Sequence, residues 1–163
     1  MVENDWPLVR AIYLEGIATS QATFETTAPR AWDEWSRNKL EVGRTVAAAS
    51  ADENDLLGWT ALSPTSSRAA YSGVAELTIY VAARARGLGI GRALLERLID
   101  DAEGAAIWTL QGSIFPENVG SRALHLAVGF REVGRREKIA RLGGAWRDTL
   151  LVERRSKLPE LND

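Results

Sequence analysis

The stretch Leu77-Thr-Ile-Tyr-Val-Ala-Ala-Arg-Ala-Arg-Gly-Leu-Gly-Ile-Gly-Arg-Ala-Leu-Leu95 reads as a buried strand that passes through a basic, glycine-rich turn into an amphipathic helix. Gly87, Gly89 and Gly91 carry no Cβ atom that would hold an anion away from the main chain. The first amides of a helix have no partner inside the helix, and they attract negative charge. The segment therefore predicts a phosphate-binding turn.

The spacing of these glycines distinguishes between kinds of phosphate-binding turn. A Walker loop requires Lys and then Ser or Thr after its last glycine, but Gly91 is followed by Arg92 and Ala93. A Rossmann turn counted from Gly87 would need its third glycine at Arg92, and no acidic residue ends a second strand at the required distance. The pattern Arg/Gln-x-x-Gly-x-Gly/Ala fits Arg86 to Gly91, and it resembles the pyrophosphate motif of the GNAT acyltransferases. An ordinary strand-to-helix turn is the alternative, but three alternate glycines exceed what such a turn requires.

The composition fits one globular domain over residues 1–163. Of these residues, 45% are hydrophobic and 26% are charged, so the chain can bury a sizeable core. The net charge of -2 argues against nucleic acid as a main partner, which would need a clustered basic face. No apolar run approaches the ~20 residues of a membrane span, and the start lacks the pattern of a signal peptide. We therefore expect a cytoplasmic protein without a membrane partner.

Cysteine is absent from the chain, and histidine occurs once. The lack of cysteine excludes disulfides, thiolate metal sites and a cysteine nucleophile. A single histidine leaves little for a metal centre, so we expect no metal. Any acyl transfer must therefore use a route other than an acyl-cysteine.

Hydrophobic periodicity predicts the order of helices and strands. A helical period is found over 6–18, where Asn4 and Asp5 are candidate N-caps, and over 31–42, 89–103 and 118–128. Strand patterns occur over 44–51, 56–62, 74–81, 107–112, 131–139 and 146–153. The polar run 52–55 reads as a turn between the first two strands.

This order of elements resembles the GNAT fold over nearly the whole chain. The resemblance implies an α/β domain whose central sheet is mixed, mostly antiparallel, flanked by helices and splayed at the cofactor-binding strand. Further motifs narrow the resemblance to the phosphinothricin and methionine-sulfoximine N-acetyltransferase group. They are Ala22-Thr-Phe-Glu-Thr26, Arg68-x-x-Tyr71, Glu76-Leu-Thr-Ile-Tyr-Val81, Asn118-x-x-Ser-x-x-Leu-His125-x-x-x-Gly-Phe130 and Gly144-x-Trp146-x-Asp148.

The start of the chain departs from that group. Its members usually begin with a short strand that reads Ile-Arg-x-Ala-Thr, whereas here Met1 to Asp5 already sits where the first helix begins. We expect the first edge strand to be missing, either from the fold or because the start codon was assigned downstream of the real one. The intact mass of protein made from the native locus separates these two explanations.

The resemblance implies that acetyl-CoA is the acetyl donor. Its pyrophosphate would lie on the turn formed by Arg86, Gly87, Leu88, Gly89, Ile90 and Gly91. The side chains of Ile79, Tyr80 and Val81 read as strand core, but in the GNAT fold the backbone of this strand pairs with the pantetheine arm. One of its amides also faces the thioester oxygen, where negative charge builds during attack.

Glu76 is the candidate general base. A carboxylate is unusual in a stretch that otherwise reads as a central strand. An amine substrate arrives as ammonium and cannot attack a thioester until a proton leaves. The same position carries the proposed base in the phosphinothricin group. The alternative is an exposed strand end that pairs with a nearby arginine.

His125 is a second candidate for a residue that transfers protons, because an unperturbed histidine titrates near neutrality. Many GNAT enzymes have tyrosine here, near the CoA sulfur, so the resemblance implies a donor to the departing thiolate and makes direct base action the weaker option. The alternative is a packing residue at a helix edge. Asn118 and Ser121 fit a helix N-cap pair, and in the family this asparagine also contacts the cofactor arm.

The resemblance also implies an acceptor pocket. The matching positions lie in the first connector, the long loop and the final hairpin; they are Phe24, Glu25, Thr26, Arg68, Tyr71 and Trp146. An arginine suits a substrate carboxylate, and aromatic rings suit an apolar stem. Surface exposure or core packing is the alternative for each of them. Relatives often have Tyr-Arg where this chain has Tyr71-Ser72, which puts phosphinothricin itself in doubt.

The sequence therefore predicts an N-acetyltransferase that acts on the α-amino group of a small amino acid or analogue by direct attack in a ternary complex. Candidate acceptors are phosphinothricin, methionine sulfoximine, methionine sulfone or an ordinary amino acid. The alternatives are a polyamine, aminoglycoside or peptide N-terminus as acceptor, or a non-catalytic acetyl-CoA sensor. Related enzymes are often dimers, and the chain has six tryptophans, so we expect a homodimer.

Overall fold

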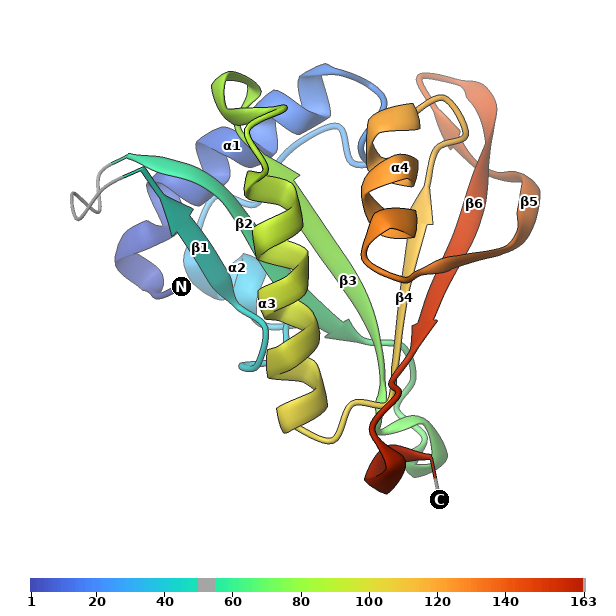
Figure 1. The fold of residues 1–163 in the computed structure, drawn as a ribbon. Helices are drawn as coiled ribbons and strands as arrows, with labels where there is room; N and C mark the ends of the chain where they lie inside the picture. The colour runs from blue at the N-terminus through green and yellow to red at the C-terminus, as the bar shows by residue number, and fades with distance from the viewer. Residues whose placement is uncertain (50–54, 163) are drawn as a thin grey trace.

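The computed structural model describes residues 1–49 and 55–162, and Figure 1 shows its ribbon. The helices are α1 Trp6–Ala18, α2 Trp32–Ser36, α3 Ile90–Gly104 and α4 Val119–Ala127. The strands are β1 Thr45–Ala48, β2 Leu56–Pro64, β3 Val74–Val81, β4 Thr109–Ile114, β5 Arg131–Leu142 and β6 Ala145–Arg155. Short 3-10 helices lie at Glu3–Asp5, Ala69–Tyr71, Ala83–Ala85 and Pro159–Leu161. The predicted α/β class is confirmed.

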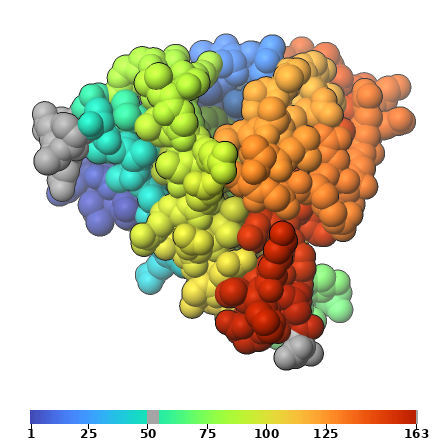
Figure 2. All heavy atoms as spheres, viewed as in Figure 1, coloured from blue at the N-terminus to red at the C-terminus, as the bar shows by residue number. Residues whose placement is uncertain are grey.

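Within the described residues, the strands form one sheet in the order β1-β2-β3-β4-β6-β5. Neighbouring strands are antiparallel except β3 and β4, which are parallel. Helices α3 and α4 cover one face of the sheet, and α1 and α2 lie on the other (Figure 1). The space-filling view in Figure 2 shows α3, α4 and the C-terminal segment together on the first face.

Strand β3 divides the core between these two faces, because alternate side chains of a strand point to opposite sides. Ala75 and Leu77 belong to a buried cluster with Leu95 and Leu98 of α3. Tyr80 belongs to a second cluster, which holds residues of α1, α2 and β2. Both faces of β3 are therefore packed, which fixes the position of the glycine turn that follows it.

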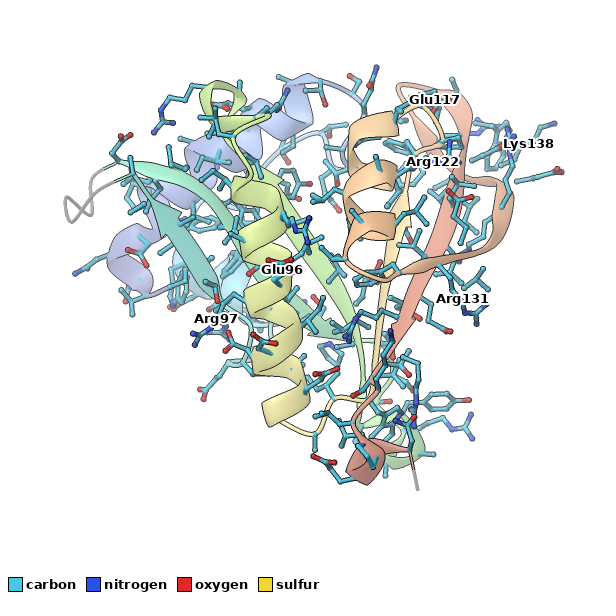
Figure 3. The ribbon with its side chains drawn as sticks, viewed as in Figure 1. Glu96, Arg97, Glu117, Arg122, Arg131 and Lys138 are labelled. Atoms are coloured by element: carbon cyan, nitrogen blue, oxygen red, sulfur yellow. The ribbon has the colours of Figure 1, made fainter. Side chains whose placement is uncertain are left out.

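Helix α3 begins directly after the glycine turn and follows the predicted apolar stripe. Its buried residues are Leu94, Leu95, Leu98, Ile99 and Ala102. Its outer face carries two i,i+4 ion pairs, Arg92 with Glu96 and Arg97 with Asp101. Figure 3 shows Glu96 and Arg97 on this outer face. Such exposed pairs contribute little, so burial of the stripe holds the helix to the sheet.

Helix α2 is shorter than the helix predicted over 31–42. The backbone after it bonds elsewhere, since Leu40 N donates to Leu62 O at 2.8 Å. The guanidinium of Arg44 donates to the carbonyl groups of Leu40 at 2.6 Å and Lys39 at 2.7 Å. These tertiary hydrogen bonds replace helical ones, so this prediction was wrong beyond the first turn.

The capping of α1 also differs from the prediction. The Asp5 carboxylate accepts a hydrogen bond from Val2 N at 2.7 Å and makes no cap bond to α1. Asn4 lies within the 3-10 helix that precedes α1, and in the described residues no strand comes before that helix. Residues 52–54 of the predicted turn, and 50 and 51 of the predicted strand before it, lie outside the described residues.

Candidate active site

Strands β3 and β4 separate after a short parallel contact. Their pairing runs from Val74 opposite Thr109 to Glu76 opposite Gln111, and it ends there. Beyond Glu76, β3 continues to Val81 and stays paired with β2. Figure 1 shows the two strands diverging toward the glycine turn and α4. The predicted splay of this strand is confirmed.

The divergence leaves one edge of β3 beyond Glu76 without a neighbouring strand in the described part of the chain. Ala82 N donates to Leu57 O at 2.8 Å, so by the alternation of an antiparallel ladder Tyr80 also turns its backbone toward β2. Ile79 and Val81 turn their N–H and C=O groups the other way, into the gap left by β4. The prediction of free backbone groups over Ile79, Tyr80 and Val81 therefore narrows to Ile79 and Val81.

The glycine turn lines a cavity of about 450 Å³, which we call the glycine-turn cavity. Most of the residues predicted to bind the cofactor line this cavity: Ile79, Tyr80, Val81, Arg86, Gly87, Gly89, Gly91, Asn118 and Ser121. They come from β3, the turn and the N-terminus of α4. The fold thus brings the start of α4 to the continuous strand-and-turn segment that precedes it by about 30 residues in the sequence.

Backbone conformation explains why glycine is needed in the turn. Gly87 and Gly89 have φ angles of 77° and 81°, in the left-handed region that other residues rarely adopt. Apart from the adjoining residues of the chain, no atom of the described residues lies within 4 Å of the place where a Cβ would be built on either glycine, so their backbone is open to a ligand. Leu88 and Ile90 do not line the cavity. Leu88 is exposed, and Ile90 packs against the core cluster of α1 and β2.

A second cavity of about 640 Å³ contains Glu76, and we call it the Glu76 cavity. It adjoins the glycine-turn cavity, because Gln21, Ala22, Ile79, Tyr80, Asn118 and Ser121 line both. His125, Phe24 and Glu25 line it as well. The two adjoining cavities extend from the glycine turn past Ile79 to Glu76, and we call them together the channel.

Glu76 is half-buried in the wall of its cavity. It lies opposite Ser63 of β2 and Gln111 of β4, at the point where β3 and β4 separate. Among the described residues, it forms no ion pair with any arginine or lysine. The alternative of an exposed carboxylate paired with an arginine does not fit this environment.

His125 is buried, with 2% of its surface exposed. Its Nδ1 lies 2.8 Å from the carbonyl oxygen of Ser121. A carbonyl can only accept, so Nδ1 carries the proton and Nε2 of the neutral ring is an acceptor. Burial lowers the pKa of His125, while the bond to Ser121 opposes this shift. A neutral ring in this tautomer has no proton to give a thiolate through Nε2, so the structure favours an acceptor over the predicted donor.

The predicted acceptor residues divide into two sets. Phe24 lines the Glu76 cavity and packs against Phe115, with 4.8 Å between ring centroids, and Glu25 lines it as well. Thr26, Arg68, Tyr71 and Trp146 do not line it. Arg68 lies over the exposed ring of Tyr71 at 5.4 Å, and Arg141 lies over the exposed ring of Trp146 at 4.4 Å. Arg68, Tyr71 and Trp146 take part in cation–π contacts at the surface, and together with Thr26 they lie outside the Glu76 cavity. Their part in acceptor binding stays a prediction.

The arrangement of a splayed sheet, a glycine turn and a shared channel matches known proteins. The sequence model of the Acetyltransferase (GNAT) family matches residues 9–130. The chain belongs to this family. The resemblance to its phosphinothricin group is also confirmed, because phosphinothricin N-acetyltransferase of Alcaligenes faecalis is 32% identical over 155 residues, which cover 93% of this chain and 78% of that protein.

Solved structures of GNAT enzymes superpose on most of the chain. The ribosomal-protein-alanine N-acetyltransferase of Brucella melitensis has a TM-score of 0.85 at 30% identity and covers 96% of this chain and 97% of its own. The phosphinothricin acetyltransferase of Sinorhizobium meliloti, in complex with acetyl-CoA, has a TM-score of 0.82 at 28% identity. It covers 95% of this chain and 85% of its own. The protein is therefore a GNAT N-acetyltransferase.

GNAT acetyltransferases use acetyl-CoA as the acetyl donor, and the residues of the glycine-turn cavity fit such a ligand. The left-handed Gly87 and Gly89 leave room above a helix N-terminus for a pyrophosphate. The free backbone of Ile79 and Val81 offers the edge of a strand to an extended arm. Two neighbouring sites thus suit the two chemically different parts of this ligand.

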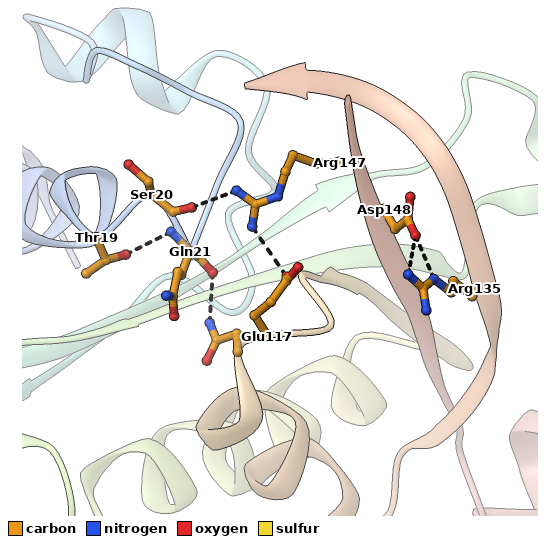
Figure 4. A network of polar contacts seen from close by, with 8 residues as sticks. Thr19, Ser20, Gln21, Glu117, Arg135, Arg147 and Asp148 are labelled. Atoms are coloured by element: carbon orange, nitrogen blue, oxygen red, sulfur yellow. Dashed lines mark hydrogen bonds and ion pairs between the residues drawn. The ribbon is translucent and has the colours of Figure 1, made fainter. Parts of the chain in front are cut away.

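A polar network joins three elements around the channel (Figure 4). Asn118 caps α4 by accepting from Ser121 N at 3.1 Å, as predicted, and its Nδ2 donates to Gln21 O at 3.1 Å. Arg147 of β6 donates to Ser20 O at 3.4 Å and pairs with Glu117 at 3.3 Å. The connector after α1 is therefore tied to α4 and β6, and it closes one side of both cavities.

Sequence reasoning missed several residues of the site. Lys39 lines the Glu76 cavity, as does Thr149, whose Oγ1 is buried without a hydrogen-bond partner among the described residues. Arg147 holds the connector, and its guanidinium lies 4.5 Å from the centroid of the Phe115 ring. Lys39 and Thr149 lie in none of the motifs quoted above, and Arg147 is the variable position between Trp146 and Asp148 in the last of them. Lys39 falls inside the predicted helix over 31–42, where the pattern treats a lysine as a surface residue.

Proposed function

We propose that this protein transfers the acetyl group of acetyl-CoA to the α-amino group of a small amino acid or analogue, by direct attack in a ternary complex. The observation that carries the proposal is that the two cavities adjoin and share the lining residues Ile79, Asn118 and Ser121. A donor on the glycine turn and an acceptor beside Glu76 would meet in the shared part. The absence of cysteine agrees with direct attack.

Each residue has a separate task in this proposal. Acetyl-CoA supplies an activated acyl group as a thioester. Glu76 takes one proton from the substrate ammonium, and the amine nitrogen then forms the amide bond as the thioester C–S bond breaks. The second proton lost from nitrogen goes to the released thiolate. A free backbone N–H of Ile79 or Val81 is placed to donate to the thioester oxygen as negative charge builds there.

The names of the relatives support an α-amine as acceptor, and they indicate two substrate classes: free amino acids or their analogues, and the N-terminus of a protein. The Alcaligenes relative acts on phosphinothricin by its name, and the Brucella enzyme is named for the alanine of a ribosomal protein. Because phosphinothricin is an amino-acid analogue, we propose a free amino acid or analogue as the main acceptor and a peptide N-terminus as the second candidate. Methionine sulfoximine and methionine sulfone belong to the first class.

A thiol-release assay with acetyl-CoA tests this function. The panel contains common amino acids, phosphinothricin, methionine sulfoximine, methionine sulfone, an alanyl peptide and a polyamine. We expect the free amino acids or analogues to give the highest kcat/KM. Acetyl-CoA binding without thiol release from any amine would support a sensor instead. A polyamine as the best acceptor would also overturn the proposal.

No helix among the described residues is long and apolar enough to cross a membrane. The cytoplasmic location and the single-domain organisation expected from the sequence stay predictions.

A further inference from the structure

Lys39 is a half-buried cation that lines the Glu76 cavity. It lies between α2 and β1, and its Nζ donates to Ser63 Oγ at 2.8 Å. The same Nζ lies 6.0 Å from the centroid of the Trp35 ring. Lys39 takes part in no ion pair within the described ranges. Its ammonium therefore loses water contacts on folding without gaining a carboxylate, an arrangement that an anionic ligand would stabilise.

The register of β2 and β3 places this cation beside the candidate base. Ser63, which accepts the Lys39 hydrogen bond, lies directly opposite Glu76. Residues directly opposite in an antiparallel pair project from the same face of the sheet. Lys39 and Glu76 both line the Glu76 cavity, and they do not pair with each other. Desolvation lowers the pKa of Lys39, while the charge of Glu76 opposes this shift, which is consistent with their proximity.

The charges around the cavity make Lys39 distinctive. Among the described residues that line it, Lys39 is the only lysine or arginine, beside the carboxylates of Glu25, Glu34 and Glu76. One of these is already engaged, because Glu34 accepts from Arg30 N at 2.9 Å. His125 is neutral in the tautomer described above. A substrate carboxylate inside this cavity therefore has one cationic side chain to bind.

An α-amino acid carries an ammonium and a carboxylate on the same carbon, whereas a polyamine or a peptide N-terminus has no carboxylate beside its amine. We propose that Lys39 binds the carboxylate of the acceptor while Glu76 faces its ammonium, so that the enzyme selects free α-amino acids over other amines. This inference rests on the proposed function and specifies the recognition of its substrate. It replaces the role in carboxylate binding that the sequence suggested for Arg68.

Lys39→Met tests the inference, because it removes the charge and keeps an unbranched apolar side chain. The matched control is Arg37→Met, an exposed cation in the same connector. The probes are L-methionine sulfone and its carboxamide, which lacks the negative charge. We expect Lys39→Met to raise KM for L-methionine sulfone about tenfold or more, since hydrogen bonds to charged groups are among the stronger ones. KM for the carboxamide and affinity for CoA should stay within about twofold in both variants.

Calorimetry keeps the test independent of turnover. Binding of each probe to the enzyme–CoA complex is measured for the wild type, Lys39→Met and Arg37→Met. Selective loss of L-methionine sulfone binding in Lys39→Met supports the inference. A wild type that binds the probe but releases no thiol would overturn only the proposed function and not this inference. The inference is overturned if the wild type binds both probes equally, if it binds neither, or if Lys39→Met weakens both to the same extent.

Discussion

At the scale of single residues, the site depends on where the sheet opens. Glu76 is the last β3 residue paired with β4, so its side chain lies at the apex of the splay. His125 reaches the same cavity from α4, with its Nδ1 proton held by Ser121. A carboxylate and a neutral imidazole thus face one channel, and each role can be tested separately.

Replacement of Glu76 tests the base. We expect Glu76→Gln to lower kcat by about 10² or more, since general base catalysis contributes roughly 10²–10⁴-fold. The pH dependence of the remaining rate should change, because glutamine does not titrate. Steady-state kinetics between pH 6 and 9 measure both effects, and CoA affinity serves as a folding control. Unchanged kinetics in this variant would remove Glu76 from the mechanism.

The buried imidazole predicts a pH-dependent stability. Burial lowers the pKa of His125, whereas the pKa of histidine in an unfolded chain is about 6.5. Below pH 6.5 the unfolded chain binds a proton at His125, whereas the folded chain binds it only at lower pH. The contribution of the neutral, buried imidazole to the free energy of unfolding is therefore fully present above about pH 6.5 and is lost as the pH falls through the folded pKa. We compare urea denaturation of the wild type and His125→Gln from pH 7.5 to 5. The difference between their free energies of unfolding should shrink as the pH falls; a constant difference would contradict the prediction.

At the scale of elements, the glycine turn joins a doubly packed strand to a helix. Gly89 lies at the N-cap of α3 with a left-handed backbone, and a Cβ there would meet no atom within 4 Å. A substitution at this position therefore acts through backbone strain and not through a clash. Its effect should be confined to the turn and to the ligand that the turn binds.

Gly89→Ala should weaken acetyl-CoA binding by about fivefold to thirtyfold, because a left-handed non-glycine residue costs roughly 1–2 kcal/mol and the turn amides shift to relieve it. Gly104→Ala is the control. It lies at the other end of α3, also with open space around it and without a left-handed φ. Calorimetry with CoA measures both variants. Equal affinities for Gly89→Ala and the wild type would argue against an anion on this turn.

The connector after α1 is held by a side chain from the other end of the sequence. Arg147→Met would break the contacts to Ser20 and Glu117 and leave Phe115 without the guanidinium above it. We expect KM to rise severalfold for both substrates, since this connector lines both cavities. Arg131→Met is the control, because its ion pair with Glu153 is largely exposed on β5, where Figure 3 labels Arg131. Similar kinetics for Arg147→Met and Arg131→Met would show that the contacts of Arg147 with the connector are not needed for substrate binding.

At the scale of the whole molecule, most of the tryptophans turn out to be part of the fold. Trp6, Trp35 and Trp59 are buried in one cluster between α1, α2 and β2, and Trp32 packs against it. The ring centroids of Trp6 and Trp35 are 5.3 Å apart. Trp146 is 52% exposed. The tryptophan count therefore supports a dimer less than the sequence implied, and the homodimer stays a prediction.

Sedimentation velocity measures the oligomeric state. We expect the mass of a dimer, because β5 is an exposed edge strand that carries Val133 and Ile139 on its surface. The exposed Val133→Lys and Ile139→Lys variants should shift the equilibrium toward the monomer. The Leu14→Lys variant, an exposed position on α1, provides a comparison. A monomer at micromolar concentration in the wild type would refute the prediction.

The sequence by itself determined the strand, turn and helix around Gly87 to Gly91, because alternating apolar residues and left-handed glycines are local requirements. It also determined the cap of α4 by Asn118 and the position of Glu76 in its strand. It did not determine the end of α2, since the carbonyl groups that would have continued that helix accept from Arg44. It could not give the tautomer of His125, which depends on one carbonyl at 2.8 Å.

The tertiary structure alone decided which residues line the site. Lys39 enters the cavity because the backbone after α2 bonds to β2, and Arg68 stays outside because it stacks on Tyr71 in an exposed turn. The tie between Ser20 and Arg147 joins residues far apart in the chain, and no local pattern contains such a contact. Propensity and periodicity describe neighbours along the chain, whereas a binding cavity depends on which distant side chains the packed sheet brings to one gap.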